Sequence, residues 1–461
     1  MGLTRSGLVL AGLLIIALVV MVAPVWATRV TLNPGDSIQG AINNASAGDA
    51  IVLNPGTYNQ NGIKVSKDIT LEANTSAGGS PANTIIDAQG KWMLSSVSNS
   101  FVVDNLSLKN GCGGYGGAIN AVGDLTILHS TFTHFKASLP SSWGGAVYVK
   151  GTLAIDSSTF TDCWANQGGA IYSEHGGTIV NSTFSGCSSG WGGAIDSPND
   201  QPLTVSGSSF NNCSATGRSD NSGGAIYARG SVTIENSTID NCKATYEGGG
   251  ISSTGTVTIE NSSFDNCEAA IVGGGAIYSE HGGTISNTNF STCSAWNGGA
   301  IDSPNDQPLT VSGSSFINCS ATGIVTDGKG GAIYAKDLTV SGSTFNSCSA
   351  LRGGGIYSSG VQLLTVSGST FNSCSAGWGG AINSEHGSDI GNTTFSTCSA
   401  ARDGGGIFSV VKLHITYSSF VKCSAEHASA IYVLGNFMYD DSTISNLNGC
   451  TVWRDGKPVT F

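Results

Sequence analysis

The sequence predicts an all-β fold, a single-stranded right-handed parallel β-helix (a solenoid) with a short N-terminal capping helix and about 26 residues per coil. A phrase that begins Gly-Gly-Ala-Ile-Tyr and ends Ser-Thr-Phe-x-x-Cys-Ser-Ala recurs from about residue 113. Eleven cysteines stand at one place in this phrase and span 260 residues from Cys163 to Cys423, a mean period of 26. Between glycine corners, short runs alternate β-branched and small polar residues, as strands do. Stacked units of this kind bury a core that one unit cannot bury alone.

Residues 1–27 are predicted to be a signal peptide, with an uncleaved anchor as the alternative. Arg5 precedes an apolar run from Leu8 to Ala23, and Val25-Trp26-Ala27 has the small-residue form of a cleavage site. No second apolar stretch of spanning length follows, so the body is not expected to cross a bilayer. We therefore expect an exported chain that is extracellular, on the cell surface or in the envelope, which means the outer membrane if the source is bacterial.

Three segments follow the signal. Residues 28–112 are predicted to form an N-terminal cap and the first irregular coils, with a short helix around Ser37-Ile38-Gln39 and Ala41-Ile42. Residues 113–434 form the repeat β-helix, and residues 435–461, which lose the glycine pair, form a C-terminal coil and cap. Both ends need covering because an open sheet edge invites aggregation.

The repeats were copied in blocks. Residues 168–217 and 274–323 carry nearly the same text at an offset of 106 residues, and a third, partial copy begins at Gly379. Copying multiplies every candidate site, whereas an active site is usually singular. The sequence therefore favours a binding protein over an enzyme and indicates no cofactor.

Two family resemblances cover most of the chain. The opening, with Pro55-Gly56-Thr57-Tyr58 and Ile85-Ile86-Asp87, resembles the start of many pectin-lyase-like β-helix proteins. The repeats resemble those of the polymorphic outer membrane proteins, whose signatures are GGA[ILV] and FxxN; Gly117-Ala118-Ile119 matches the first. The second departs from its pattern, because cysteine mostly replaces the asparagine, as in Phe210-Asn211-Asn212-Cys213. The resemblance implies a surface protein or adhesin.

The in-register cysteines are expected to stack as one column inside the helix. A buried ladder of apolar thiols is the favoured interpretation, and disulfides between neighbouring coils are the alternative. Zinc is disfavoured because a straight column supplies poor tetrahedral geometry. The column consists of Cys163, Cys187, Cys213, Cys242, Cys267, Cys293, Cys319, Cys348, Cys374, Cys398 and Cys423.

Aromatic residues form the candidate binding site. Period-two alternation places the residue after each repeat isoleucine outward, and tryptophans precede some glycine pairs on the same edge. Flat rings in this arrangement could stack on sugars, or they could stabilise neighbouring strands by stacking on each other. The candidate ligand-binding residues are Tyr148, Tyr172, Tyr227, Tyr278, Tyr334, Tyr357, Trp143, Trp191 and Trp378.

Other polar groups do not assemble into one site. The pairs Glu174/His175, Glu280/His281 and Glu385/His386 could transfer protons, but successive copies lie four coils apart, roughly 19 Å at the strand spacing. Their corner position favours solvated turns, and no catalytic residue is assigned. The loops containing Asp196 and Asp200, and Asp302 and Asp306, are weak calcium candidates whose spacing matches no known calcium loop. Ten Asn-x-Ser/Thr sequons could carry glycans.

The net charge of the chain narrows the range of expected binding partners. The formal charge of −12, with no basic stripe, argues against nucleic acid. We expect an adhesin-like, exported protein that binds glycans or other surface ligands through a repeated face. A polysaccharide lyase or glycoside hydrolase on the same scaffold, or a structural coat protein, remains the alternative.

Overall fold

The computed structural model describes residues 27–137, 141–216, 220–323 and 328–461. The predicted signal peptide lies outside these residues, apart from Ala27. The chain divides into two compact units. Unit 1 comprises the described residues up to Cys187 together with Ile195–Ser208, and unit 2 comprises Ser188–Ala194 and Ser209–Phe461.

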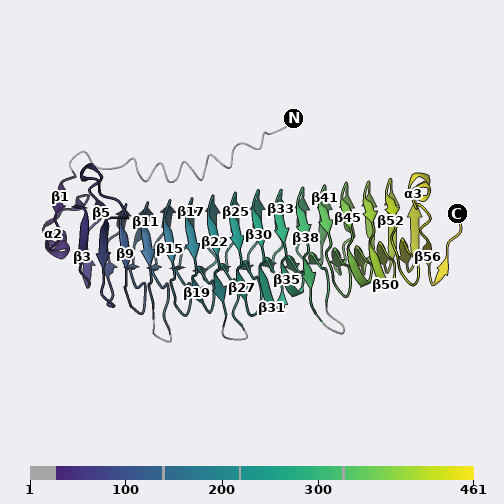
Figure 1. Ribbon diagram of the computed structural model, residues 1–461, viewed down its shortest axis with the longest axis horizontal. Coiled ribbons are helices and arrows are strands. Elements are labelled where there is room, and N and C mark those ends of the chain that lie inside the picture. The colour runs from purple at the N-terminus through teal and green to yellow at the C-terminus, as the bar shows by residue number, and fades with distance from the viewer. Residues whose placement is uncertain (1–26, 138–140, 217–219, 324–327) are drawn as a thin grey trace. The chain divides into compact units, whose positions relative to one another are not determined.

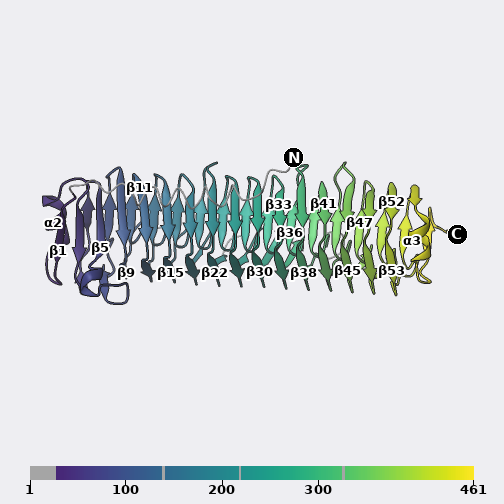
Figure 2. The same cartoon turned by 90° about the horizontal axis from the view of Figure 1, so that it is seen from above.

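Each unit is a parallel β-helix, which confirms the predicted fold class. A coil of unit 2 contains β32 (Ile277–Ser279) in sheet C, β33 (Gly283–Ser286) in sheet A and β34 (Asn289–Ser291) in sheet B. Each strand pairs in parallel with its counterpart one coil on, so that Ile277 faces Ile301, Ile285 faces Val311 and Phe290 faces Phe316. Within each unit, strands of successive coils therefore lie side by side (Figures 1 and 2).

Unit 1 begins with β1 (Arg29–Leu32) and the helix α2 (Ile38–Asn44). The Ser37 side chain caps α2 by accepting a hydrogen bond from the Gly40 N–H at 3.0 Å. Ile38 and Ile42 are buried, and α2 packs on β2 (Ala50–Leu53) and β4 (Ile63–Val65). The predicted capping helix is confirmed.

Unit 2 ends differently from its regular coils. After β55 (Asn436–Tyr439), the short helix α3 (Asp441–Ser445) packs on β52 (Lys412–Thr416). The strands β56 (Val452–Arg454) and β57 (Lys457–Pro458) then form an antiparallel pair. The segment boundaries at residues 112 and 434 stay a prediction.

Sheet C carries the candidate site. In unit 1 it contains β4, β7 (Leu94–Ser96), β10 (Ile119–Ala121), β13 (Val147–Val149), β16 (Ile171–Ser173) and β20 (Ile195–Ser197). In unit 2 it contains β24 (Ile226–Ala228), β28 (Ile251–Ser253), β32, β36 (Ile301–Ser303), β40 (Ile333–Ala335), β43 (Ile356–Ser358), β47 (Ile382–Ser384), β51 (Ile407–Ser409), β54 (Ile431–Val433), β56 and β57.

The core consists of ladders of identical side chains. In unit 2, phenylalanine rings from Phe264 to Phe420 stack coil upon coil; Phe290 and Phe316 are parallel within 2° at 4.8 Å between centroids. In unit 1, Phe160 stacks in the same way on Phe184. Each ring is removed from water and contacts its equivalents above and below, so the repeat supplies both burial and packing.

The glycine pairs permit close stacking at one corner of the coil. Gly330 has φ of +65°, a conformation that a side chain would strain, and a Cβ there would overlap the Ile333 carbonyl oxygen. A Cβ on Gly331 would overlap the carbonyl oxygen of Gly354 in the next coil. The pair is therefore required by backbone approach between coils.

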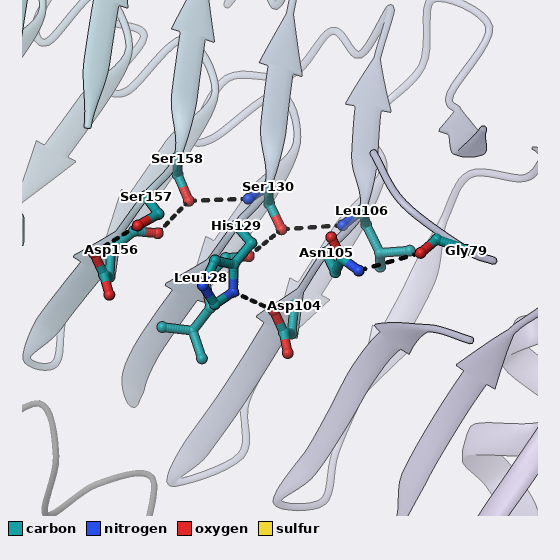
Figure 3. Close-up of polar contacts among 10 residues, drawn as sticks. All are labelled: Gly79, Asp104, Asn105, Leu106, Leu128, His129, Ser130, Asp156, Ser157 and Ser158. Atoms are coloured by element: carbon teal, nitrogen blue, oxygen red, sulfur yellow. Dashed lines mark hydrogen bonds and ion pairs between the residues drawn. The ribbon is translucent and has the colours of Figure 1, made fainter. Parts of the chain in front are cut away.

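A ladder of hydroxyl groups precedes sheet B and was not predicted. The Ser130 N–H donates to Ser158 Oγ at 3.1 Å, and the Leu106 N–H donates to Ser130 Oγ at 3.2 Å (Figure 3). Each hydroxyl donates in turn to a carbonyl of its own coil, as Ser130 does to Leu128 O at 2.6 Å. The ladder satisfies buried N–H groups at a corner where strand pairing is interrupted.

The cysteine column lies inside both units. Its members in unit 2 from Cys242 to Cys423 are thiols, and all are buried. They donate to backbone carbonyls, as Cys293 Sγ does to Phe264 O at 3.7 Å and to Ser291 O at 3.4 Å. Burial raises the pKa of the Cys267 thiol and that of the Cys319 thiol well above the ordinary value for cysteine.

Candidate functional site

We call the outward side of sheet C, together with the residue that precedes each glycine pair, the C face. The central residue of each sheet C strand points outward because side chains alternate along a strand. Stacking then aligns these residues in a column, beside a second column formed by the residues before the glycine pairs. Lys329, Arg352 and Trp378 are neighbours in that second column.

In unit 1, the predicted aromatic residues form a packed cluster. The Trp143 ring stacks on Tyr172 with centroids 5.0 Å apart, and Tyr148 lies 5.6 Å from Tyr172. Tyr148 and Tyr172 are only 4% and 7% exposed. The expectation that these tyrosines face solvent is therefore wrong, because the Trp143 ring and the neighbouring rings cover them. The contacts match the strand-stabilising alternative.

In unit 2, cationic groups lie over the aromatic rings of the C face. Lys329 Nζ lies 5.7 Å from the Tyr334 centroid and 5.5 Å from that of Tyr357. Two guanidinium groups lie over Trp378, that of Arg352 at 5.3 Å and that of Arg402 at 4.7 Å. Cation–π contact holds these cations in place.

The remaining predicted rings are dispersed. Tyr227, Tyr278, Tyr334 and Trp378 are partly exposed, whereas Tyr357 is 1% exposed and covered like the rings of unit 1. Trp191 is also partly exposed, and its carbonyl accepts a hydrogen bond from Ser189. The structure thus brings Tyr334, Tyr357 and Trp378 together with cations.

Two glutamates of the Glu-His pairs contact tyrosines of the C face. Glu174 accepts a hydrogen bond from Tyr148, and Glu385 accepts one from Tyr357 and pairs with Arg352 at 3.7 Å. Burial, and then the hydrogen bond to the glutamate, raises the pKa of Tyr148 and Tyr357.

Two histidines of the Glu-His pairs contact the backbone of the preceding coil. His175 Nδ1 and His281 Nδ1 contact backbone carbonyls of the preceding coil, those of Lys150 and Thr254. In the Glu174/His175 pair, the two side chains therefore contact different partners.

A carboxyl cluster in unit 2 was missed by sequence analysis. Asp302, at the outward position of β36, pairs with Tyr278 of β32 and reaches over Gly273, where a Cβ would overlap its carboxylate. Glu247 directly precedes Gly248, whose backbone N–H donates a hydrogen bond to Gly273 O at 3.1 Å. Asp302 and Glu247 thus belong to the coils on either side of Gly273, and the charge of Glu247 acts on Asp302.

These carboxyl groups hold protons more tightly than usual. Burial, partly opposed by the Tyr278 hydrogen bond, raises the pKa of Glu247 from 4.5 to about 7. Burial, and next the charge of Glu247, raises the pKa of Asp302 well above its ordinary value. Asp302 is 2% exposed, and its Oδ1 has no hydrogen-bond partner among the described residues. Glu247 can therefore donate a proton near neutral pH.

The calcium hypothesis gains no support. Asp196 and Asp302 are buried in the strands, whereas Asp200 and Asp306 are exposed in the turns. Within the described ranges, no three His, Cys, Asp or Glu side chains gather closely enough to hold a metal ion. Asp306 instead pairs with Lys336 at 3.3 Å.

Sequence analysis also missed the cations of the C face. Lys329, Arg352 and Arg402 are separated by tens of residues, and only coil stacking brings them to the same rings. Aligning the residues that precede each glycine pair would have identified Lys329 and Arg352.

In the part of the chain that the structure covers, no helix has the length and apolarity to span a membrane.

Comparison with solved structures finds β-helix proteins of several kinds. A PL6 family polysaccharide lyase, Pedsa3628 from Pseudopedobacter saltans, is 13% identical, with a TM-score of 0.39 over 74% of this chain and 84% of that chain. PfbA, a surface adhesin of Streptococcus pneumoniae, is 14% identical, with a TM-score of 0.38 over 94% and 96%. A GH87 alpha-1,3-glucanase from Streptomyces thermodiastaticus is 13% identical, with a TM-score of 0.36 over 95% and 72%. At such low identity and TM-score, these likenesses carry no argument about activity.

No curated protein sequence matches the chain. The family model described as "Right handed beta helix region" matches residues 145–303 and 195–361. This match supports the right-handed β-helix and the wider pectin-lyase-like resemblance, and it leaves the polymorphic outer membrane protein repeat unconfirmed. The central part of the chain is thus similar in sequence to right-handed β-helix regions.

Proposed function

We propose that this chain is an exported, adhesin-like β-helix protein that binds glycans through the C face of unit 2. The observation that carries the proposal is the gathering of Lys329, Arg352 and Arg402 over the rings of Tyr334, Tyr357 and Trp378. Rings supply apolar area to a sugar, and fixed charged groups supply directional hydrogen bonds to its hydroxyls.

The arrangement differs from a simple aromatic platform. Because the guanidinium groups cover Trp378 and Tyr357 is buried, a glycan would first meet charged groups and partly exposed rings. Glu385 neutralises part of this charge by pairing with Arg352. Donors and acceptors therefore lie together, as hydroxyl-rich ligands require.

The experiment is a glycan array probed with the chain that begins at Thr28, alongside variants. Lys329→Ala and Arg402→Ala should each reduce binding several-fold. Lys422→Ala is the matched control, because Lys422 is an exposed cation at the corner after β53 (Ser419–Val421) in sheet B. Failure to bind any glycan, or equal binding by all three variants, would overturn the proposal. Self-assembly without glycan binding would instead favour a structural coat.

A second candidate function rests on the carboxyl cluster around Gly273. Glycoside hydrolysis needs one carboxyl group that protonates the leaving oxygen and another that activates water or attacks the sugar. The raised pKa of Glu247 favours the proton-donating role, and Asp302 is the second carboxyl group nearby. The test is incubation with a polysaccharide panel: new reducing ends that disappear in Glu247→Gln and Asp302→Asn would support hydrolysis. An intact panel would leave the chain a binding protein.

A further inference from the structure

We infer that unit 1 carries a separate binding site for one ring of a neutral saccharide, in a hollow built on Trp164. The hollow has a volume of about 450 Å³ and is lined by His134, Lys136, Asp162 and Trp164. It lies at the corner after sheet B, so it is not part of the C face. The choice of a glycan ligand rests on the proposed function, whereas the site does not.

Two neighbouring coils form the hollow in the same way. After β12 (Thr131–Thr133), the chain presents His134 and Lys136 outward while Phe135 is buried; after β15 (Thr159–Thr161), it presents Asp162 and Trp164 outward while Cys163 is buried. The backbones of Lys136 and Trp164 form a bridge. Two rows of two side chains result, about 4.8 Å apart along the coil axis, a spacing close to the width of a sugar ring.

The polar side chains of the hollow are held in place. His134 Nε2 lies 3.4 Å from Asp162 Oδ2, and Lys136 Nζ lies 5.5 Å from the Trp164 ring centroid. Gly186 follows in the same column, where a Cβ would overlap Asp162 Oδ1, so the glycine makes room for the carboxylate.

The lining chemistry selects the ligand class. Trp164 is 39% exposed even with Lys136 over its ring, and this exposed ring surface supplies the apolar contact that a pyranose ring needs, in contrast to the buried tyrosines of the C face. Lys136 can donate to a hydroxyl, and Asp162 can accept from the adjacent one. One ammonium and one carboxylate leave the hollow near neutral, and the chain carries −12 overall, so a neutral ring is preferred to an acidic one.

These residues depart from the repeat. At the Lys136 and Trp164 positions, later coils have Ser294 and Ser320, and two further coils have Lys243 and Glu268, which pair at 3.0 Å. At the Gly186 position the copied block has Thr292. Trp164 is the one aromatic residue that directly follows a column cysteine, so the ring of the hollow is not part of the copied repeat.

The test measures binding of maltohexaose and cellohexaose as neutral probes, and of polygalacturonate as an acidic probe, by calorimetry on the chain from Thr28. Trp164→Ala should weaken binding of a neutral probe about tenfold. Gly186→Asn introduces a residue that tolerates positive φ but whose Cβ would displace the Asp162 carboxylate, and it should weaken binding similarly. Trp92→Ala is the matched control, because Trp92 is 40% exposed outside the hollow.

Equal affinity of Trp164→Ala and Trp92→Ala, no binding of either neutral probe, or preference for the acidic probe would overturn the inference. The C-face variants separate the two proposals. If Lys329→Ala abolishes array binding while Trp164→Ala has no effect on neutral probes, the hollow fails and the proposed function stands. If Trp164→Ala weakens binding of neutral probes while Lys329→Ala leaves array binding unchanged, the inference about the hollow stands and the proposal for the C face fails.

Discussion

The proton held by Glu247 makes the stability of unit 2 depend on pH. In the folded chain the Glu247 pKa is about 7, against 4.5 for an ordinary glutamate. Between these values the folded state binds more protons than the unfolded state, so the free energy of unfolding falls as pH rises from about 4.5 to about 7. The shift corresponds to about 3 kcal/mol, an upper bound for a partly exposed side chain that can relax.

The variant Glu247→Gln removes this titration and keeps an oxygen that can accept from Tyr278. We expect the variant to match the wild type near pH 4 and to exceed its unfolding free energy by about 2–3 kcal/mol near pH 8. Urea titrations at several pH values measure this difference. Glu260→Gln, at an exposed position of β29 (Val257–Glu260), is the control and should leave the pH profile unchanged. Parallel profiles for the wild type and Glu247→Gln would refute the reasoning.

Three further predictions concern the ladders. Phe290→Ala removes a ring that is 0% exposed and should lower the unfolding free energy by about 3–5 kcal/mol, measured by urea unfolding; a change below about 1 kcal/mol would contradict the stacked core. Ser314→Ala deprives the Thr288 N–H of its acceptor at 3.2 Å and should cost about 1–3 kcal/mol, whereas Ser367→Ala, at an exposed position, should cost almost nothing. Cys293, which is 0% exposed, should react with a thiol reagent only after unfolding; rapid labelling of the native chain would show that the column is open.

The repeat period predicted the fold because each repeat of about 26 residues forms one coil of the β-helix. The phenylalanine and cysteine columns need only the correct register, and every coil gives the same register. The asparagines of the sequons were interpreted as possible glycan sites, yet seven of them, including Asn181 and Asn236, have positive φ. Their backbone conformation alone is a reason for asparagine at these corners.

The site was harder to predict because the exposure of an outward side chain depends on whether neighbouring side chains cover it. Alternation placed Tyr172 on the correct side of its strand, but the Trp143 ring from another column covers it. Likewise, the net charge of −12 gives no sign of a local cluster of cations. Lys329, Arg352 and Arg402 reach the same group of rings only when the coils stack. Such contacts between columns do not follow from the spacing within one column.

Hydrogen exchange in the presence of a bound glycan tests the central claim most directly. With the oligosaccharide that binds most tightly on the array, amides around Lys329, Arg352 and Trp378 should exchange more slowly than in the free chain. Amides of β41 (Leu338–Ser341) and β44 (Leu364–Ser367), which lie in sheet A of the same coils, should be unchanged. Protection confined to sheet A or sheet B, or no protection at all under saturating glycan, would contradict binding at the C face.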